Sequence, residues 1–206
     1  AAVALAYVAY GATGSRALVP YSAYGPNKEM AEGLMKGLGV EVEAYDPLIG
    51  AGISELIREN TALIWTESPG SVTMDVQDVP AIVEAAHARG VAVALDNTYA
   101  AGVLFDAFAH KVDVSIQALT KYVGGHSDIL LGSVSVRDQA GFEAMGPVYR
   151  QLGLAVSPDD CSLALRGLQT LGLRLAHLEG ATLGVANWLV DQDVIAEVYH
   201  PALPGC

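Results

Sequence analysis

Residues 75–96 read DVQDVPAIVEAAHARGVAVALD and carry the clearest structural pattern in the chain. The first part predicts a helix, Gln77–Arg89, because an aspartate precedes it and Gly90 stops it. The second part, Val91–Leu95, is an uninterrupted apolar run, which is typical of a strand buried on both faces of a parallel sheet. With the apolar run Ala62–Thr66 before them, these elements predict a strand–helix–strand unit.

The same alternation extends along the chain. Further strands are predicted at Arg16–Val19, Val40–Ala44, Val112–Gln117 and Ile129–Val136, and further helices at Asn27–Leu38 and Ile53–Glu59. Alternation at this spacing predicts the α/β class, as a three-layer α/β/α arrangement around a mostly parallel sheet.

The pattern changes after the last of these strands. Ser157–Asp160 is a strong helix start, with a serine cap, a proline at the first helical position and acids at the positive end of the dipole. A long helix to about Val190 and a short strand at Val194–Tyr199 are predicted to follow. We therefore expect a large domain over residues 1–167, and a connecting helix with the beginning of a second domain over residues 168–206.

The composition excludes several classes of function. The 206 residues are 52% apolar and 17% charged, which is enough for a hydrophobic core and excludes disorder. A net charge of −12 argues against nucleic-acid partners and anionic membranes, because both need excess positive charge. The uncharged stretch Ala1–Ser15 is shorter than the ~18–20 residues of a membrane span and lacks a basic start, so neither a span nor a signal peptide is expected.

Cysteine and histidine usage points to a reduced protein without metal. Cys161 and Cys206 have no ligand-like spacing and no disulfide framework, so a cytoplasmic location is expected. The five histidines form no i,i+4 pair and have no cysteine at ligand spacing, so no metal site is expected. Gly11–Gly14 fits neither a P-loop nor a dinucleotide fingerprint. The chain lacks an initiator methionine and begins inside a predicted helix, so we expect a fragment.

The chemistry is expected at the carboxyl edge of the sheet, where open parallel sheets bind ligands. Lys121 is the only formal charge between residues 114 and 127, so desolvation is expected to lower its pKa and make its amine nucleophilic. Asp96 ends a buried strand and needs a partner charge, and Tyr24 lies in a turn where its ring could stack on a ligand. Simpler interpretations stay open: a surface lysine, a helix-capping aspartate and a packing tyrosine.

An amine, a carboxylate, an aromatic ring and hydroxyl groups at one sheet edge match the needs of pyridoxal phosphate. This cofactor requires a lysine for its aldehyde, an acid for its pyridine nitrogen, a ring to stack on and donors for its phosphate. Taken together, these residues are the set that pyridoxal phosphate needs.

The chain resembles the Cys/Met-metabolism family of fold-type-I pyridoxal-phosphate enzymes. The segments that carry the resemblance are Glu67–Ser71 (ESPGS), Asp96–Thr98 (DNT) and Ser115–Asp128 (SIQALTKYVGGHSD). It is most similar to the β-eliminating members, on the evidence of Asp46–Gly50 (DPLIG), Gly70-Ser71 and Gln117-Ala118. Leu165–Leu168 and His200–Leu203 extend the likeness over essentially the whole chain.

The resemblance implies roles for individual residues. Lys121 and Tyr24 are implied as catalytic residues: Lys121 bonds to the cofactor aldehyde and moves the substrate α-proton, and Tyr24 stacks on the cofactor ring. Asp96 is implied to pair with the pyridine nitrogen, and Thr120 to donate to the phosphate. Ala118 stands where many relatives carry a phosphate-binding serine, so that contact is not expected.

The resemblance also implies the larger context. Residues 1–167 would be a pyridoxal-phosphate-binding large domain like that of aspartate aminotransferase, with a glycine-rich phosphate cup just before Ala1. The implied reaction is carbon–sulfur lysis of a small thioether amino acid by a homotetramer. Two alternatives stay open: a sibling enzyme with γ-acting or sulfhydrylase chemistry, and a non-catalytic fragment that retains only the fold.

Overall fold

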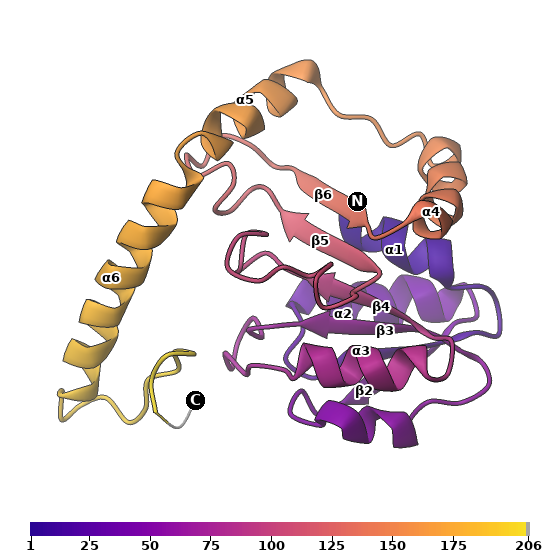
Figure 1. Ribbon diagram of the computed structural model, residues 1–206, viewed down its shortest axis with the longest axis horizontal. Coiled ribbons are helices and arrows are strands. Elements are labelled where there is room, and N and C mark those ends of the chain that lie inside the picture. Colours follow the sequence, from indigo (N-terminus) through magenta and orange to yellow (C-terminus); the bar gives the residue numbers. More distant parts are fainter. Residues whose placement is uncertain (205–206) are drawn as a thin grey trace.

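A mostly parallel sheet forms the centre of the protein (Figure 1). The computed structural model describes residues 1–204, and within them the sheet has six strands in the spatial order β2-β1-β3-β4-β5-β6. The strands are β1 (Arg16–Pro20), β2 (Glu41–Tyr45), β3 (Thr61–Glu67), β4 (Ala92–Asp96), β5 (Val114–Ala118) and β6 (Gly132–Val136). Neighbouring strands are parallel, except that β6 pairs antiparallel with β5.

Helices cover both faces of the sheet, as Figure 1 shows for α3 in front of it. The helices are α1 (Ala2–Tyr10), α2 (Gly25–Met30), the π-helical η1 (Ala31–Met35), the 3-10 helix η2 (Gly50–Glu55), α3 (Val79–His87), α4 (Gln139–Gln151), α5 (Pro158–Leu168) and α6 (Leu171–Val190). The helices α1, η1 and α4 pack on one face, and α3 and η2 on the other. The predicted α/β class with three layers is confirmed.

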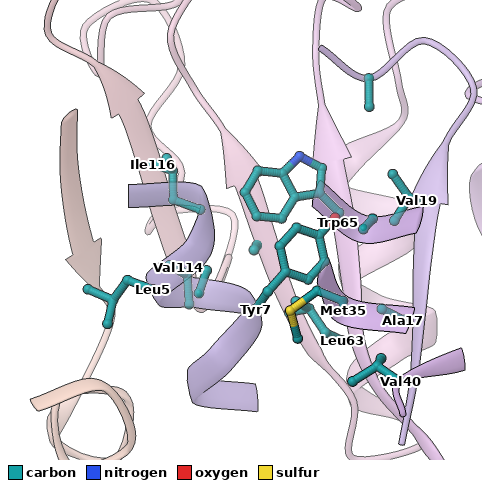
Figure 2. Close-up of a cluster of buried hydrophobic side chains, with 14 of the residues drawn as sticks. Leu5, Tyr7, Ala17, Val19, Met35, Val40, Leu63, Trp65, Val114 and Ile116 are labelled. Carbon is teal, nitrogen blue, oxygen red and sulfur yellow. The ribbon is translucent and has the colours of Figure 1, made fainter. Parts of the chain in front are cut away.

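Each face of the sheet has its own hydrophobic core. In the first, Trp65 of β3 is fully buried and stacks on Tyr7 of α1, with ring centroids 5.0 Å apart (Figure 2). In the second, Ile64 of β3 packs with Leu95 of β4 and Ile82 of α3. Because successive strand residues point to opposite faces, burial on both sides explains why the strands are continuous apolar runs.

Several predicted elements differ from those of the structure. Residues 194–199 form no strand: they follow α6 and pair with no strand among residues 1–204, and an unpaired strand leaves its backbone groups unsatisfied. The helix expected at Ile53–Glu59 is the shorter η2, which begins at Gly50 and ends at Glu55. The strand expected from Ile129 begins later, at Gly132.

The C-terminal segment, which consists of α5, α6 and residues 191–204, forms an arm beside the sheet (Figure 1). The single helix expected after Ser157 is two helices, α5 and α6, separated at Gln169 and Thr170. No helix within residues 1–204 is both long and apolar enough to cross a membrane. The division into residues 1–167 and 168–206 stays a prediction, and Cys206 lies outside the described residues.

Candidate active site

The carboxyl edge of the sheet opens into a cavity of about 1650 Å³. Lys121, Asp96, Tyr24 and Thr120 all line it, although they lie on three separate loops. The structure therefore brings the four predicted site residues together. Their chemical roles stay predictions.

Lys121 lies in the turn directly after β5, where its backbone nitrogen donates to the oxygen of Ala118 at 3.0 Å. Its side chain is exposed, so the expected desolvation is wrong: the cavity is open, and the ammonium group reaches solvent. Within residues 1–204 this side chain makes no hydrogen bond or ion pair, and the amine is therefore available to a ligand.

Asp96 lies at the end of β4, on the same cavity. Burial raises the pKa of its carboxyl, and two hydrogen bonds from Thr98 act in the opposite direction. The Thr98 backbone nitrogen and hydroxyl both donate to Oδ1, at 3.1 and 2.5 Å. Within residues 1–204 no cation pairs with Asp96, so this partly buried carboxylate would be stabilised by a positively charged ligand.

Tyr24 and Thr120 differ in how freely they can meet a ligand. Tyr24 is the N-cap residue of α2, and its side chain is 46% exposed at the cavity. The Thr120 hydroxyl donates to the oxygen of Leu131 at 3.2 Å and accepts from its nitrogen at 3.0 Å. Because a hydroxyl has one proton, donation to a phosphate would require Thr120 to give up its bond to Leu131 oxygen.

The sequence analysis assigned no role to Glu67, which proves to be the most buried acid of the cavity. Glu67 ends β3, lies opposite Asp96 in the strand register and is 2% exposed. It accepts hydrogen bonds from the Tyr24 backbone nitrogen and the Ser71 hydroxyl. Burial raises its pKa to about 7. The rule that singled out Asp96, an acid at the end of an apolar strand, also applies to Glu67.

The start of α1 also borders the cavity, through Ala1, Ala2 and Val3. The first helical hydrogen bond runs from Leu5 nitrogen to Ala1 oxygen, so the preceding N–H groups have no partner within the helix. Such a helix N-terminus favours a phosphate group. The expected phosphate cup before Ala1 would therefore continue into residues of this chain.

The side chains around the cavity fit pyridoxal phosphate. They offer an unpaired amine for an aldehyde, a partly buried carboxylate for a pyridine nitrogen and an exposed ring, and the start of α1 adds a helix N-terminus for a phosphate. No group of three or more His, Cys, Asp or Glu side chains in the described part of the chain could hold a metal ion.

Fold and cavity together define an α/β protein of the class that holds pyridoxal phosphate. The match to a family model then gives the family directly. The chain belongs to the Cys/Met metabolism PLP-dependent enzymes, whose model matches residues 1–206.

Individual relatives agree with this family. A protein of Rhizobium johnstonii is 48% identical over 205 residues, which cover 100% of this chain and 52% of that protein. The cystathionine beta-lyase MetC of Escherichia coli is 42% identical over 207 residues, with 100% and 52% covered. The crystal structure of cystathionine gamma-lyase from Lactobacillus plantarum with L-serine has a TM-score of 0.93 at 26% identity, covering 98% of this chain and 53% of that one. The chain spans about half the length of these relatives.

Proposed function

We propose that the protein is a pyridoxal-phosphate-dependent carbon–sulfur lyase that breaks the Cβ–S bond of L-cystathionine. With one water molecule, β-elimination yields homocysteine, which is the precursor of methionine, together with pyruvate and ammonia. The observation that carries the proposal is the convergence of the unpaired Lys121 amine and the partly buried Asp96 carboxylate on one cavity. The 42% identity to a cystathionine beta-lyase supports the substrate.

When bound, pyridoxal phosphate supplies a conjugated ring that draws electron density away from the substrate Cα. Lys121 has the complementary task of moving the proton. Because its Nζ makes no ion pair within residues 1–204, Lys121 would be free to hold the cofactor through its aldehyde carbon, and its amine, once released from that carbon, would remove the α-proton. The electron pair left at Cα then forms the new double bond to Cβ as the thiolate leaves.

Asp96 and Tyr24 would hold the reacting groups in place. The Asp96 carboxylate, fixed by Thr98, would keep a proton on the pyridine nitrogen, because a positive charge there stabilises the partly buried carboxylate. The half-exposed ring of Tyr24 would cover one face of a planar ligand. Thr120 would contribute to the phosphate site together with the start of α1.

A sibling enzyme is the second candidate function. Methionine γ-lyase, cystathionine γ-synthase and the sulfhydrylases would use Lys121, Asp96 and Tyr24 in the same way. The structural similarity to the cystathionine gamma-lyase of L. plantarum supports this second candidate. Breaking the Cγ–S bond of cystathionine would give 2-oxobutyrate in place of pyruvate.

Product analysis on the protein at its natural length tests the proposal. The protein is loaded with pyridoxal phosphate and given L-cystathionine, and the 2-oxo acid is identified by chromatography. We expect pyruvate, whereas 2-oxobutyrate would assign the protein to the γ-acting siblings. Lys121→Ala should abolish both turnover and the visible absorption of the covalently bound cofactor. A wild-type protein that shows neither would be non-catalytic.

The assembly and location belong to the same proposal. The family resemblance supports a homotetramer with sites that are shared between subunits, and the lack of a disulfide framework supports a cytoplasmic location. For the 206-residue chain alone we expect weak or no turnover, because an arginine for the substrate carboxylate is expected from the part of the relatives that this chain does not span.

A further inference from the structure

Glu67 is a buried carboxylate on the cavity that has no role in the proposed reaction. Within residues 1–204, no lysine, arginine or histidine forms an ion pair with it. Its titratable neighbours are Asp96 on β4, Tyr99 in the loop after β4 and Tyr7 on α1, which all interact with it electrostatically. The charge of Glu67 is therefore stabilised mainly by hydrogen bonds.

Two hydrogen bonds connect Glu67 to two different loops of the cavity. Its Oε2 accepts from the Tyr24 backbone nitrogen at 2.8 Å, and its Oε1 accepts from the Ser71 hydroxyl. The same loops also meet directly, because the Ser71 nitrogen donates to the oxygen of Ser22 at 3.0 Å. Tyr24 and Ser71 both line the cavity, so Glu67 positions two of its walls.

The two donors respond differently to a proton on Glu67. A backbone N–H can only donate, whereas a hydroxyl can either donate or accept. An ionised Glu67 only accepts, so the Ser71 hydroxyl must give its proton to Oε1. A protonated Glu67 donates from Oε1 to the Ser71 oxygen and frees the serine proton. Oε2 accepts from Tyr24 in both states, so protonation changes only the Ser71 hydrogen bond.

We propose that Glu67 is a positioning residue that switches Ser71 between two acceptors, the Glu67 carboxylate and an oxygen of pyridoxal phosphate in the cavity. This inference rests on the cofactor of the proposed function and is independent of which carbon–sulfur bond breaks. Because burial raises the pKa of Glu67 to about 7, both states are populated near neutral pH. At lower pH Ser71 donates to the cofactor, and at higher pH it donates to Glu67.

The dissociation constant of pyridoxal phosphate, measured by equilibrium dialysis on the protein at its natural length, tests the switch. Because other groups also change charge with pH, the informative quantity is the ratio between Ser71→Ala and the wild type at each pH. A hydrogen bond to a charged oxygen predicts a ratio of about ten well below pH 7 and about one well above it. A ratio that does not change with pH would overturn the proposal.

Glu67→Gln provides the second arm of the test. Its amide would accept from Tyr24 and donate to Ser71, which imitates the protonated acid at every pH. We therefore expect Glu67→Gln to bind the cofactor with the hydrogen bond from Ser71 at every pH. Well below pH 7 its affinity should match that of the wild type, about tenfold tighter than Ser71→Ala, and well above pH 7 it should keep this tenfold advantage. Glu84→Gln, which removes an exposed charge on α3, is the matched control and should follow the wild type.

Infrared spectroscopy adds a readout that needs no activity. The carbonyl stretch of a protonated, buried carboxyl should appear in the wild type as the pH falls through 7 and should be missing in Glu67→Gln. Its absence from the wild type would overturn the inference, even if Glu67→Gln fails to fold. If cystathionine yields 2-oxobutyrate, the proposed function fails and this switch stands. If pyruvate forms while the Ser71→Ala ratio stays constant, the switch fails and the function stands.

Discussion

Trp65 and Trp188, the two tryptophans of the chain, lie in regions of opposite character. Trp65 on β3 is 0% exposed and stacks on Tyr7, whereas Trp188 on α6 is 60% exposed. The helix α6 is rich in Leu, Val and Ala, yet its buried residues are only Leu171, Leu175 and Ala186. An apolar sequence is therefore no measure of burial in this chain, because the sheet is covered on both faces and the arm is not.

The two regions meet at a tight junction behind Lys121. Arg174 of α6 donates to the backbone oxygens of Tyr122, Val123 and Gly167, at 2.5, 3.3 and 2.7 Å. A Cβ on Gly167 of α5 would lie 2.0 Å from the oxygen of Val123. The arm thus contacts the segment that follows the lysine, so it can position Lys121 despite its small buried surface.

Replacing Trp65 with alanine should have the largest effect on the stability of the sheet. The change removes a fully buried ring and leaves a cavity against Tyr7, which costs about 3–5 kcal/mol of unfolding free energy. Urea unfolding of the 206-residue chain, followed by circular dichroism, measures this loss. A loss of unfolding free energy below about 1 kcal/mol would mean that neighbouring side chains fill the space left by Trp65. The difference in burial between the sheet and the arm would then have no consequence for stability.

Replacing Glu67 with glutamine should make the stability of the sheet less dependent on pH. The pKa of Glu67 is raised from 4.5 to about 7 on folding, so the folded state binds its proton more tightly than the unfolded state. The contribution of Glu67 to the free energy of unfolding is then greatest below pH 4.5, falls as the pH rises to about 7, and is constant above that pH. The full change is roughly 3 kcal/mol.

The measurement for Glu67 is the difference in unfolding free energy between the wild type and Glu67→Gln across this range. We expect the unfolding free energy of Glu67→Gln to increase relative to that of the wild type as the pH rises. Trp188, which is 60% exposed on α6, serves as the reference: Trp188→Phe should follow the wild-type pH dependence. If the difference between the wild type and Glu67→Gln stays constant, the carboxyl is not buried in solution.

The sheet could be predicted from the sequence because each strand carries its own signal. The run Val91–Leu95, for example, is apolar on both faces and lies between Gly90 and Asp96, so its position follows from local chemistry. The helix α4 was missed because Gly146 and Pro147 interrupt its apolar pattern, and its start depends on a cap by Asp138. The absence of a strand at residues 194–199 depends on what lies beside them, which no local pattern contains.

The site was predicted only in part, for a similar reason. Strand ends located Lys121 and Asp96, because ligands meet parallel sheets at that edge. The occupied hydroxyl of Thr120 depends on Leu131, which lies eleven residues later in the chain. The pairing of Glu67 with Tyr24 joins loops of two different strands, and only the folded sheet brings them together.

Replacing Gly167 with alanine should break the junction between the two regions. Its Cβ would meet backbone atoms of Val123 and Gly124, which cannot rotate away, so we expect a loss of about 1–3 kcal/mol. Gly180→Ala in α6 is the matched control: a Cβ there meets nothing within 4 Å, and alanine should stabilise the helix by about 0.5–1 kcal/mol. Urea unfolding of both variants should give opposite signs, and equal signs would contradict the junction.

Replacing Trp188 with alanine should have the smallest effect, within about 0.5 kcal/mol, because the ring is 60% exposed on α6. Fluorescence separates the two regions directly. In Trp65→Phe the remaining Trp188 should emit at long wavelength and be quenched readily by acrylamide, and in Trp188→Phe the remaining Trp65 should be protected. If Trp188 emits as a buried ring, or if its removal costs more than about 1 kcal/mol, then α6 packs against another surface in solution. The contrast between sheet and arm would then reflect a missing partner for α6, whose sequence is dominated by Leu, Val, Ala and Gly.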